Sequence, residues 1–272
     1  MKRCFAVLLA LCALLTLGAC GAAARDESSF SLDILDTGKS DCIIVCMDGV
    51  TVVNDAADED DFDAICAALE RRGVQRIDHL ILSHYDKDHI GSAAALVRAY
   101  PVGQIVGPDY EEESMYLTLL ERAAEERGTP FLRLAEDLTV KTENGSFTVD
   151  PPDIDYGDDN NNSLVTIVTW RGKSFLLPGD AKKNRLNELL GAALESYELI
   201  KLPHHGDSNK PLVKLIAQTA PRYAVATVSP AEKIEDKLLA ALAAAGTEVF
   251  RTDGGTVSIE WTGTDFAITQ TK

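Results

Sequence analysis

Short apolar runs separated by polar turns make up most of this chain after residue 29, and their spacing predicts a mixture of strands and helices. Runs bounded by turn residues predict strands at 30–35, 42–47, 50–53, 80–82, 164–170, 173–177 and 199–202. Apolar residues that recur every three or four positions predict helices at 62–73, 93–99, 184–194, 211–218 and 234–245. The alternation indicates an α/β or α+β fold. No Pro- or Ser-rich linker divides residues 30–272, so we expect a single domain there.

The densest group of metal-binding residue types follows the apolar run 80–82. This short segment contains His84, Asp86, Asp88 and His89. A buried strand would deliver the four side chains to one edge of a sheet, where they would crowd together unfavourably without a cation. Neutral imidazole combined with carboxylate is a ligand set that Zn²⁺ and Mn²⁺ accept. The alternative is a polar loop in which a His caps a helix and the Asp residues face water.

Two later segments repeat the pattern of an apolar run followed by a ligand residue with a glycine close by. Residues 175–177 lead into P-G-D, which ends at Asp180, and residues 199–202 lead into P-H-H-G, which contains His204 and His205. Glycine lets the backbone turn tightly beside such residues. His79 precedes the predicted strand, and we expect it to be structural. The three segments together predict one metal centre at the ends of three strands.

These segments resemble those of a known family. S-H-x-D-x-D-H-x-G, L-P-G-D and H-H-G are similar to motifs of the metallo-β-lactamase superfamily, most of all the hydrolase-like domain of ComEC-type competence (DNA-uptake) proteins and its free-standing relatives. Residues 35–41 stand where that group has D-V-G-Q-G-D, and residues 162–165 resemble its N-S-L-V strand entry. Residues 223–225 and 249–253 resemble its closing strands. The resemblance implies an α/β fold, a four-layer αββα sandwich.

The resemblance also implies how the ligands are shared between two metal ions. His84 and Asp86 would bind one ion, and Asp88 and His89 would bind the second. Asp180 would bridge both ions. Metal-activated water would then attack an ester-like centre of the substrate, because coordination lowers the pKa of water to about 7.

The two adjacent histidines have different expected roles. One of His204 and His205 would complete the second metal site, and the other would orient a ligand or act on the substrate. The expected catalytic residues are therefore Asp88, Asp180, His204 and His205.

The chain departs from the family pattern at the first metal site. Most of the superfamily has His where this chain has Asp86, as is usual in the ComEC-like group. The extra carboxylate makes the site harder, so zinc and manganese are both candidates. No histidine lies between His89 and His204, so the intermediate His of the superfamily is missing. Either the first metal is held weakly, or the replacement is a nearby Asp or one of Asn160, Asn161 and Asn162.

Other departures concern the handling of substrate. Lys39 and Ser40 replace the usual Gln-Gly, and Ser229-Pro230 stands where the ComEC-like group tends to have His-Pro. We expect both differences to affect the binding of substrate rather than the fold.

The N-terminal segment has the order of a bacterial secretory signal. Lys2 and Arg3 precede an apolar run at 5–17, and L-G-A-C then ends at Cys20 in the form of a lipobox. The apolar run is shorter than the about 20 residues that span a bilayer. We expect a lipoprotein signal peptide at 1–19, lipidation of Cys20 and a tether at 20–29. The protein would be extracytoplasmic and held to the membrane by its lipid anchor alone. The alternative is a plain signal peptide cleaved near residues 22–24.

Three cysteines follow Cys20: Cys42, Cys46 and Cys66. Their odd number, and their positions in a predicted strand and an apolar helix, indicate core thiols. None stands at a strand end beside the histidines, so a cysteine ligand is not expected.

The chain is strongly acidic, with 43 acidic and 26 basic residues and a net charge of −17. Such a surface repels phosphate backbones, and nonspecific nucleic-acid binders usually carry a basic stripe. Acidic clusters at 55–63, 109–113 and 150–159 are expected to be solvated loops and helix starts. Short basic groups follow the candidate ligands and could rim the site: Lys182 and Lys183 with Arg185, and Lys210 with Lys214.

Three functions remain open. The first is a metal-dependent hydrolase that cleaves phosphodiesters, nucleic acid included, as the ComEC-like resemblance implies. The second is a metallohydrolase of a small ester, lactone, amide or thioester, which the acidic surface favours. The third is a non-catalytic binding protein on the same fold. Metal occupancy separates the third function from the other two.

Overall fold

A computed structural model describes residues 29–192 and 195–272. The expected signal peptide, Cys20 and all but the last residue of the expected tether lie outside the described residues. Within the described ranges, no helix is long and apolar enough to cross a membrane.

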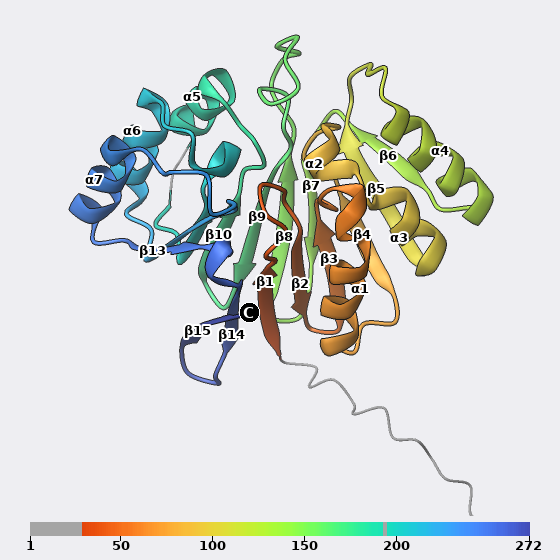
Figure 1. Ribbon diagram of the computed structural model, residues 1–272, viewed down its shortest axis with the longest axis horizontal. Coiled ribbons are helices and arrows are strands. Elements are labelled where there is room, and N and C mark those ends of the chain that lie inside the picture. Colours follow the sequence, from red (N-terminus) through yellow and green to blue (C-terminus); the bar gives the residue numbers. More distant parts are fainter. Residues whose placement is uncertain (1–28, 193–194) are drawn as a thin grey trace, which may run out of the picture.

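The first sheet has eight strands among the described residues, in the order β15-β14-β1-β2-β3-β4-β5-β6 (Figure 1). Its strands are β1 (Phe30–Ile34), β2 (Ile43–Met47), β3 (Val50–Asn54), β4 (Ile77–Ile81), β5 (Val102–Pro108), β6 (Phe131–Leu134), β14 (Thr256–Trp261) and β15 (Phe266–Thr271). The pairs from β3 to β6 are parallel, and the other pairs are antiparallel. The predicted strands 30–35, 42–47 and 50–53 agree with β1, β2 and β3 to within one residue.

The second sheet has seven strands in the described part of the chain, in the order β13-β12-β11-β10-β9-β8-β7. They are β7 (Leu138–Lys141), β8 (Gly145–Asp150), β9 (Val165–Trp170), β10 (Lys173–Leu177), β11 (Leu199–Lys201), β12 (Tyr223–Ala226) and β13 (Glu248–Arg251). The pairs from β10 to β13 are parallel. The predicted hairpin joins β9 and β10. Its two turn residues, Arg171 and Gly172, both have positive φ, as two-residue hairpin turns require.

Helices cover the outer face of each sheet (Figure 1). The first sheet carries α1 (Phe62–Arg71), α3 (Ala93–Ala99) and α4 (Met115–Arg127), with the short α2 (Lys87–Ile90) at one edge. The second sheet carries α5 (Lys183–Gly191), α6 (Lys210–Thr219) and α7 (Asp236–Ala245). The Asn209 side chain caps α6 by accepting a hydrogen bond from the Leu212 amide, and Gly246 ends α7 in the left-handed conformation.

Three apolar cores hold these layers together. Leu80 of the first sheet packs with Leu120 of α4 in one core, and Ile200 of the second sheet packs with Leu215 of α6 in another. The third core lies between the sheets, with side chains such as that of Phe175. The structure is therefore the four-layer αββα sandwich that the family resemblance implied, and Cys42, Cys46 and Cys66 lie within it without forming disulfides.

The structure corrects several sequence predictions. His79 lies within β4 rather than before it, and its ring packs 5.0 Å from the ring of Phe147. The helix predicted at 184–194 ends at Gly191, and the helix predicted from residue 234 begins at Asp236, because Glu235 is extended. Periodicity predicted no element between residues 100 and 163, where β5, α4, β6, β7 and β8 occur. Several of these strands are half-exposed, so their apolar pattern is weak.

Candidate metal centre

Three strand ends come together at one edge of the sandwich. β4 of the first sheet leads to His84 and then to α2, whereas β10 and β11 of the second sheet lead to Asp180 and His205. All three strands lie in the parallel parts of their sheets, which present their carboxyl ends at a common edge. The backbones approach closely there, since a Cβ on Gly179 would lie 2.5 Å from the Ser83 Cβ. Gly179 also has a φ of +54°, so both its small size and its conformational freedom shape this edge.

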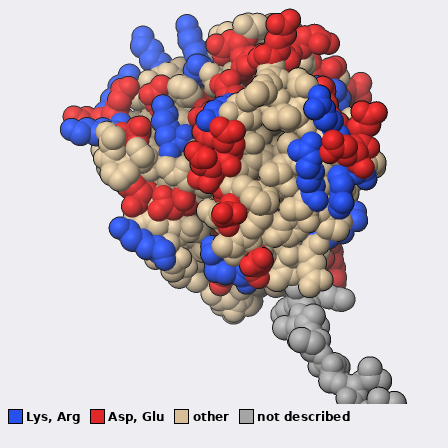
Figure 2. Space-filling view, turned by 45° about the vertical axis from the view of Figure 1, so that its right-hand side comes forward, with Lys and Arg blue, Asp and Glu red and all other residues tan. Residues whose placement is uncertain are grey.

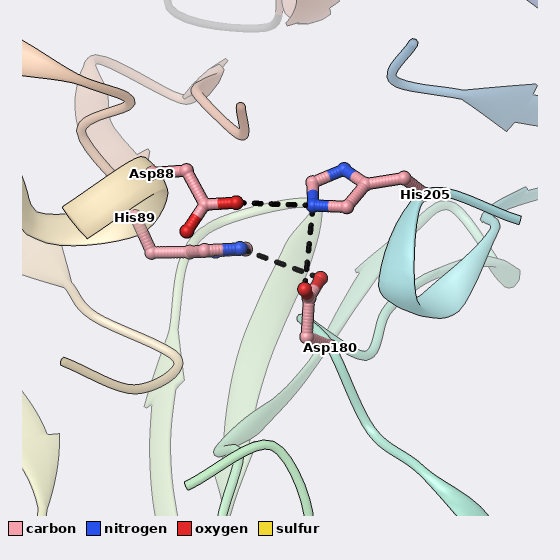
Figure 3. Close-up of side chains that lie close together, drawn as sticks. All are labelled: Asp88, His89, Asp180 and His205. Atoms are coloured by element: carbon pink, nitrogen blue, oxygen red, sulfur yellow. Dashed lines mark ion pairs between the residues drawn. The ribbon is translucent and has the colours of Figure 1, made fainter. Parts of the chain in front are cut away.

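Four side chains form a compact group, with one donor atom of each within 4.8 Å of the others: Asp88, His89, Asp180 and His205 (Figure 3). His205 Nε2 lies 3.3 Å from Asp88 Oδ2 and 3.3 Å from Asp180 Oδ2. His89 Nε2 lies 3.4 Å from Asp180 Oδ1. Ligands that lie about 2.1 Å from one ion are about 3.0 to 3.4 Å from one another in octahedral or tetrahedral coordination. These three approaches have the spacing of ligands around one divalent cation, and all four donors lie close enough together to share it.

The imidazoles of His89 and His205 are buried, and their Nε2 atoms face this group. Neither Nε2 has a hydrogen-bond partner of good geometry. The other nitrogen of each ring is anchored, since His89 Nδ1 lies 3.0 Å from Asp55 Oδ2 and His205 Nδ1 lies 2.9 Å from Thr227 Oγ1. Buried polar atoms seldom lack a partner. An unpartnered Nε2 beside an anchored Nδ1 is typical of a histidine placed to bind a metal ion.

Electrostatic forces in the group favour the charged forms of its members. Burial lowers the pKa of His89, but the negative charges of Asp180 and Asp55 outweigh that effect and raise the pKa well above its usual value. Burial raises the pKa of Asp88, yet the close approach of His205 Nε2 and the charge of His89 bring it to about 2. A divalent cation would take the place of the imidazole protons, so metal binding would release protons.

Asp55 is buried beneath the group and fixes its orientation. Its carboxylate accepts hydrogen bonds from the Ser83 amide at 2.6 Å and from the Ser83 hydroxyl at 2.9 Å, and it faces His89 Nδ1. We had expected the acidic cluster 55–63 to be solvated, and for Asp55 this prediction is wrong. Asp55 directly follows β3, in the same position relative to its strand as the predicted ligands.

Lys201 supplies a fixed positive charge beside the group. Its ammonium pairs with Asp41, lies 3.3 Å from Asp180 Oδ1 and donates a hydrogen bond to the Gly179 carbonyl at 3.1 Å. Burial lowers the pKa of Lys201, but the charges of Asp41 and Asp180 outweigh it and raise the pKa above its usual value. Asp41, Asp55 and His89 also lie close enough to hold a cation, and the Lys201 ammonium already supplies positive charge there.

A second group adjoins the first and contains the other two predicted ligands. His84 Nε2 lies 3.3 Å from Asp86 Oδ2, and the Asn160 amide nitrogen lies 3.3 Å from the former atom and 3.4 Å from the latter. Ser83 Oγ lies 2.9 Å from His84 Nδ1, so Nε2 is the nitrogen that faces the group. The rings of His84 and His89 have their centroids 4.1 Å apart, which places the two groups side by side.

The adjacent histidines His204 and His205 diverge because both have left-handed backbone conformations, with φ of 47° and 57°. This conformation is unfavourable for residues other than glycine, because their Cβ lies too close to the backbone. It turns His205 inward to the ligand group. His204 is 24% exposed, with Nδ1 2.9 Å from Asp207 Oδ2 and Nε2 3.9 Å from Asp180 Oδ2. His204 therefore lies at the open side of the site.

Acidic residues lie at the open side of the site, and Figure 2 shows acidic side chains gathered along the upper edge of the molecule. Asp159 adjoins the His84 group, and burial together with the charges of Glu112 and Asp86 raises its pKa to about 6. Burial lowers the pKa of His204, and among the basic residues expected at the rim Lys182 is close enough to lower it further. Arg185 is buried instead, and it pairs with Asp150 at 2.7 Å and with Glu188 at 2.5 Å.

Comparison with known proteins extends these findings. A family model described as the metallo-beta-lactamase superfamily matches residues 35–229. ComE operon protein 3 of Bacillus subtilis is 28% identical over 200 residues, which are 71% of this chain and 26% of that protein. Recombination protein 2 of Haemophilus influenzae is 24% identical over 207 residues, which are 73% of this chain and 24% of that protein. Competence protein ComA of Neisseria gonorrhoeae is 27% identical over 200 residues, or 70% and 26% of the two chains. The chain thus spans about a quarter of the length of these curated relatives.

Solved structures share the fold. YhfI of Bacillus subtilis, a metallo-beta-lactamase fold protein, superposes with a TM-score of 0.59 and 12% identity over 85% of this chain and 100% of its own. CmlA, a diiron beta-hydroxylase from Streptomyces venezuelae, superposes with a TM-score of 0.56 and 12% identity over 86% of this chain and 54% of its own. At these identities the likeness concerns the fold alone. With the family match over most of its length, this chain belongs to the metallo-β-lactamase superfamily.

Proposed function

We propose that this chain is a metal-dependent hydrolase that cleaves phosphodiesters with a pair of divalent ions, zinc or manganese. The observation that carries the proposal is the group of four donors within 4.8 Å of one another, linked by three approaches of 3.3 to 3.4 Å, in which two buried Nε2 atoms have no hydrogen-bond partner. Asp88, His89 and His205 would hold one ion. His84 and Asp86 would hold the other, with Asp180 between the two.

Ions held there would supply Lewis acidity, which makes water a nucleophile near neutral pH and polarises the substrate ester. The residues of the chain orient the ligands and transfer a proton. Asp55 orients His89, and Lys201 holds Asp180 in place. His204 lies at the open side with Nδ1 facing Asp207, and in its imidazolium form it would donate the Nε2 proton to the departing oxygen. Lys182 near His204 would offset part of the phosphate charge.

The relatives support a nucleic-acid substrate. The names of two of them, Recombination protein 2 and Competence protein ComA, refer to recombination and competence, and both processes involve DNA. This chain corresponds to only about a quarter of each relative, so the substrate remains part of the proposal.

The acidic open side favours a second candidate, hydrolysis of a small uncharged ester, lactone, amide or thioester. Asp86 is half-exposed there, with Asp159 and Glu112 nearby, and these carboxylates repel a polyanion. A small neutral substrate would meet no such repulsion.

Paired assays of the full chain test the two candidates. Hydrolysis of bis(p-nitrophenyl) phosphate and of p-nitrophenyl acetate would be measured with zinc or with manganese. The native chain would be compared with the double variant Asp88→Ala, His89→Ala. We expect metal-dependent turnover of the diester, lost in the double variant. Faster turnover of the carboxylic ester would favour the second candidate, and absence of bound metal in protein prepared without chelator would exclude both.

We further infer that the chain is exported and anchored through Cys20, as its lipobox-like sequence indicates. In bacteria supplied with labelled palmitate, the chain should incorporate label and fractionate with membranes. Cys20→Ser should abolish labelling. Label retained by that variant would contradict the assignment.

A further inference from the structure

We propose that Asn160 is the third ligand of the first metal site, through Oδ1, and that it makes this site selective for a hard divalent cation, Mn²⁺ rather than Zn²⁺. The inference rests on the proposed function, because it concerns one of the same two ions. It accounts for the missing intermediate histidine of the superfamily with a residue of a different type.

The geometry of Asn160 fits this role. Its amide nitrogen lies 3.3 Å from His84 Nε2 and 3.4 Å from Asp86 Oδ2, and those two atoms are 3.3 Å apart. Three donors at this spacing form a triangle that fits around one ion, since ligands of one ion are about 3.0 to 3.4 Å apart. A half-turn of the amide exchanges nitrogen for oxygen at the same place. Oδ1 would then face the ion beside His84 and Asp86.

Asn160 is held in position before any ion binds. It is only 8% exposed. Its carbonyl accepts a hydrogen bond from the Ser163 amide at 3.3 Å, and the next amide, that of Leu164, donates to the Ser83 carbonyl at 2.8 Å. The segment that carries Asn160 is thereby fastened to the residue before His84. Such an arrangement limits the entropy that a ligand loses when it binds an ion.

The neighbouring asparagines have other roles. The Asn161 carboxamide oxygen accepts hydrogen bonds from the Asn184 and Arg185 amides at the start of α5. The Asn162 carboxamide bonds to the Tyr156 amide and to Asp155. Asn160 is the one member of this run whose side chain faces His84 and Asp86.

The two sites would then differ in chemistry. His84, Asp86 and Asn160 offer one nitrogen and two oxygens, whereas the neighbouring group offers the imidazoles of His89 and His205 with its carboxylates. Amide and carboxylate oxygens suit Mn²⁺, and imidazole favours Zn²⁺. Zinc should therefore settle in the neighbouring group, and manganese should enter the site of Asn160.

Metal binding tests the inference without reference to activity. The full chain would be stripped with chelator, loaded with one equivalent of zinc and titrated with manganese, while electron paramagnetic resonance measures free Mn²⁺. We expect one manganese per chain. Asn160→Ala should weaken manganese binding about 10- to 100-fold and retain its equivalent of zinc, which also reports that the variant is folded. Asn160→His should take up a second zinc in preference to manganese, and Asn160→Asp should keep manganese. Asn161→Ala is the matched control and should bind manganese as the native chain does.

The possible results separate the ligand role of Asn160, the metal selectivity of its site and the proposed function. Manganese binding by Asn160→Ala at native affinity would show that Asn160 is not a ligand. If that variant still binds its equivalent of zinc in the neighbouring group, the proposed function is not contradicted. If Asn160→His keeps the native preference for manganese, the selectivity argument is wrong. A native chain that binds neither metal would overturn both this inference and the proposed function.

Discussion

Lys201 Nζ lies 3.3 Å from Asp180 Oδ1, so a buried ammonium neutralises a carboxylate that also faces both histidines of the ligand group. The same ammonium pairs with Asp41. Removing one member of a buried ion pair costs about 3 to 5 kcal/mol, because the remaining charge is left uncompensated. We expect Lys201→Met to lower the free energy of unfolding of the metal-free protein by about that amount, measured by urea denaturation.

An exposed lysine provides the control for this variant. Lys210→Met, at the start of α6, should change the unfolding free energy by less than about 0.5 kcal/mol. A divalent ion should stabilise Lys201→Met more than the native protein, because it replaces the missing positive charge. Equal stability of the two variants would contradict a role for Lys201 as the internal counterion.

The two adjacent histidines should separate binding from chemistry. We expect His205→Ala to weaken zinc binding at least about 100-fold, since Nε2 faces both Asp88 and Asp180. We expect His204→Ala to retain zinc but to lower kcat about 100-fold or more, as loss of a proton donor does. Zinc affinity would be measured by competition with a chromophoric chelator, and kcat with the diester. Loss of zinc from His204→Ala at the level of His205→Ala would refute this division of roles.

Asp55 should act through His89 rather than by contact with the ion. We expect Asp55→Asn to weaken zinc binding about 10- to 100-fold, because His89 Nδ1 loses the carboxylate that orients it. Asp63→Asn, on the exposed start of α1, is the control within the same acidic cluster. Unchanged zinc affinity in Asp55→Asn would mean that Ser83 and the surrounding packing are enough to orient the ring.

Asp48 should contribute stability that depends on pH. It joins the β2–β3 turn to Asn144, accepting hydrogen bonds from the Asn144 amide at 2.6 Å and its side chain at 2.8 Å. Burial raises the pKa of Asp48, but these hydrogen bonds outweigh burial and lower the pKa below its usual value. A lowered folded-state pKa makes the contribution complete above the unfolded value of about 3.9 and lost as the pH falls through the folded value.

The variant Asp48→Asn tests this dependence. Asn tolerates the positive φ of this position, so the substitution adds little backbone strain. We expect a loss of about 1 kcal/mol in unfolding free energy at pH 7 and at pH 5, and a smaller loss at pH 3.5, from urea denaturation. Exposed Asp60→Asn serves as the control. A loss that stays constant down to pH 3.5 would show that the charge of Asp48 is not what stabilises the turn.

The sequence was sufficient to predict the place of the site because the rule behind the prediction is geometric. His84, Asp180 and His205 each follow an apolar strand, and the parallel strands β4, β10 and β11 end at a common edge. Asp55 follows the strand β3 in the same way. It was not predicted as a site residue because it begins the acidic cluster 55–63, which we expected to be solvated. The rule identifies strand ends and says nothing about which charges the final packing buries.

The roles of Lys201 and Asn160 could not be predicted from the sequence, because they depend on how distant segments pack together. A lysine inside the strand β11 is unfavourable unless two carboxylates from distant segments meet it, and these are Asp41 and Asp180. Three consecutive asparagines are equivalent by composition. Their directions are set by contacts with α5 and with residues 155–156, which only the folded chain provides.

The ligand group takes Asp88 and His89 from α2, which follows β4 of the first sheet, and Asp180 and His205 from segments that follow β10 and β11 of the second. An ion held there would cross-link two distant parts of the chain, as a disulfide does, and would restrict the unfolded chain in the same way. Cys42, Cys46 and Cys66 form no such link. A chelator would break this metal cross-link and a reductant would not. The supply of metal would therefore control the resistance of the protein to proteases as well as its catalytic activity.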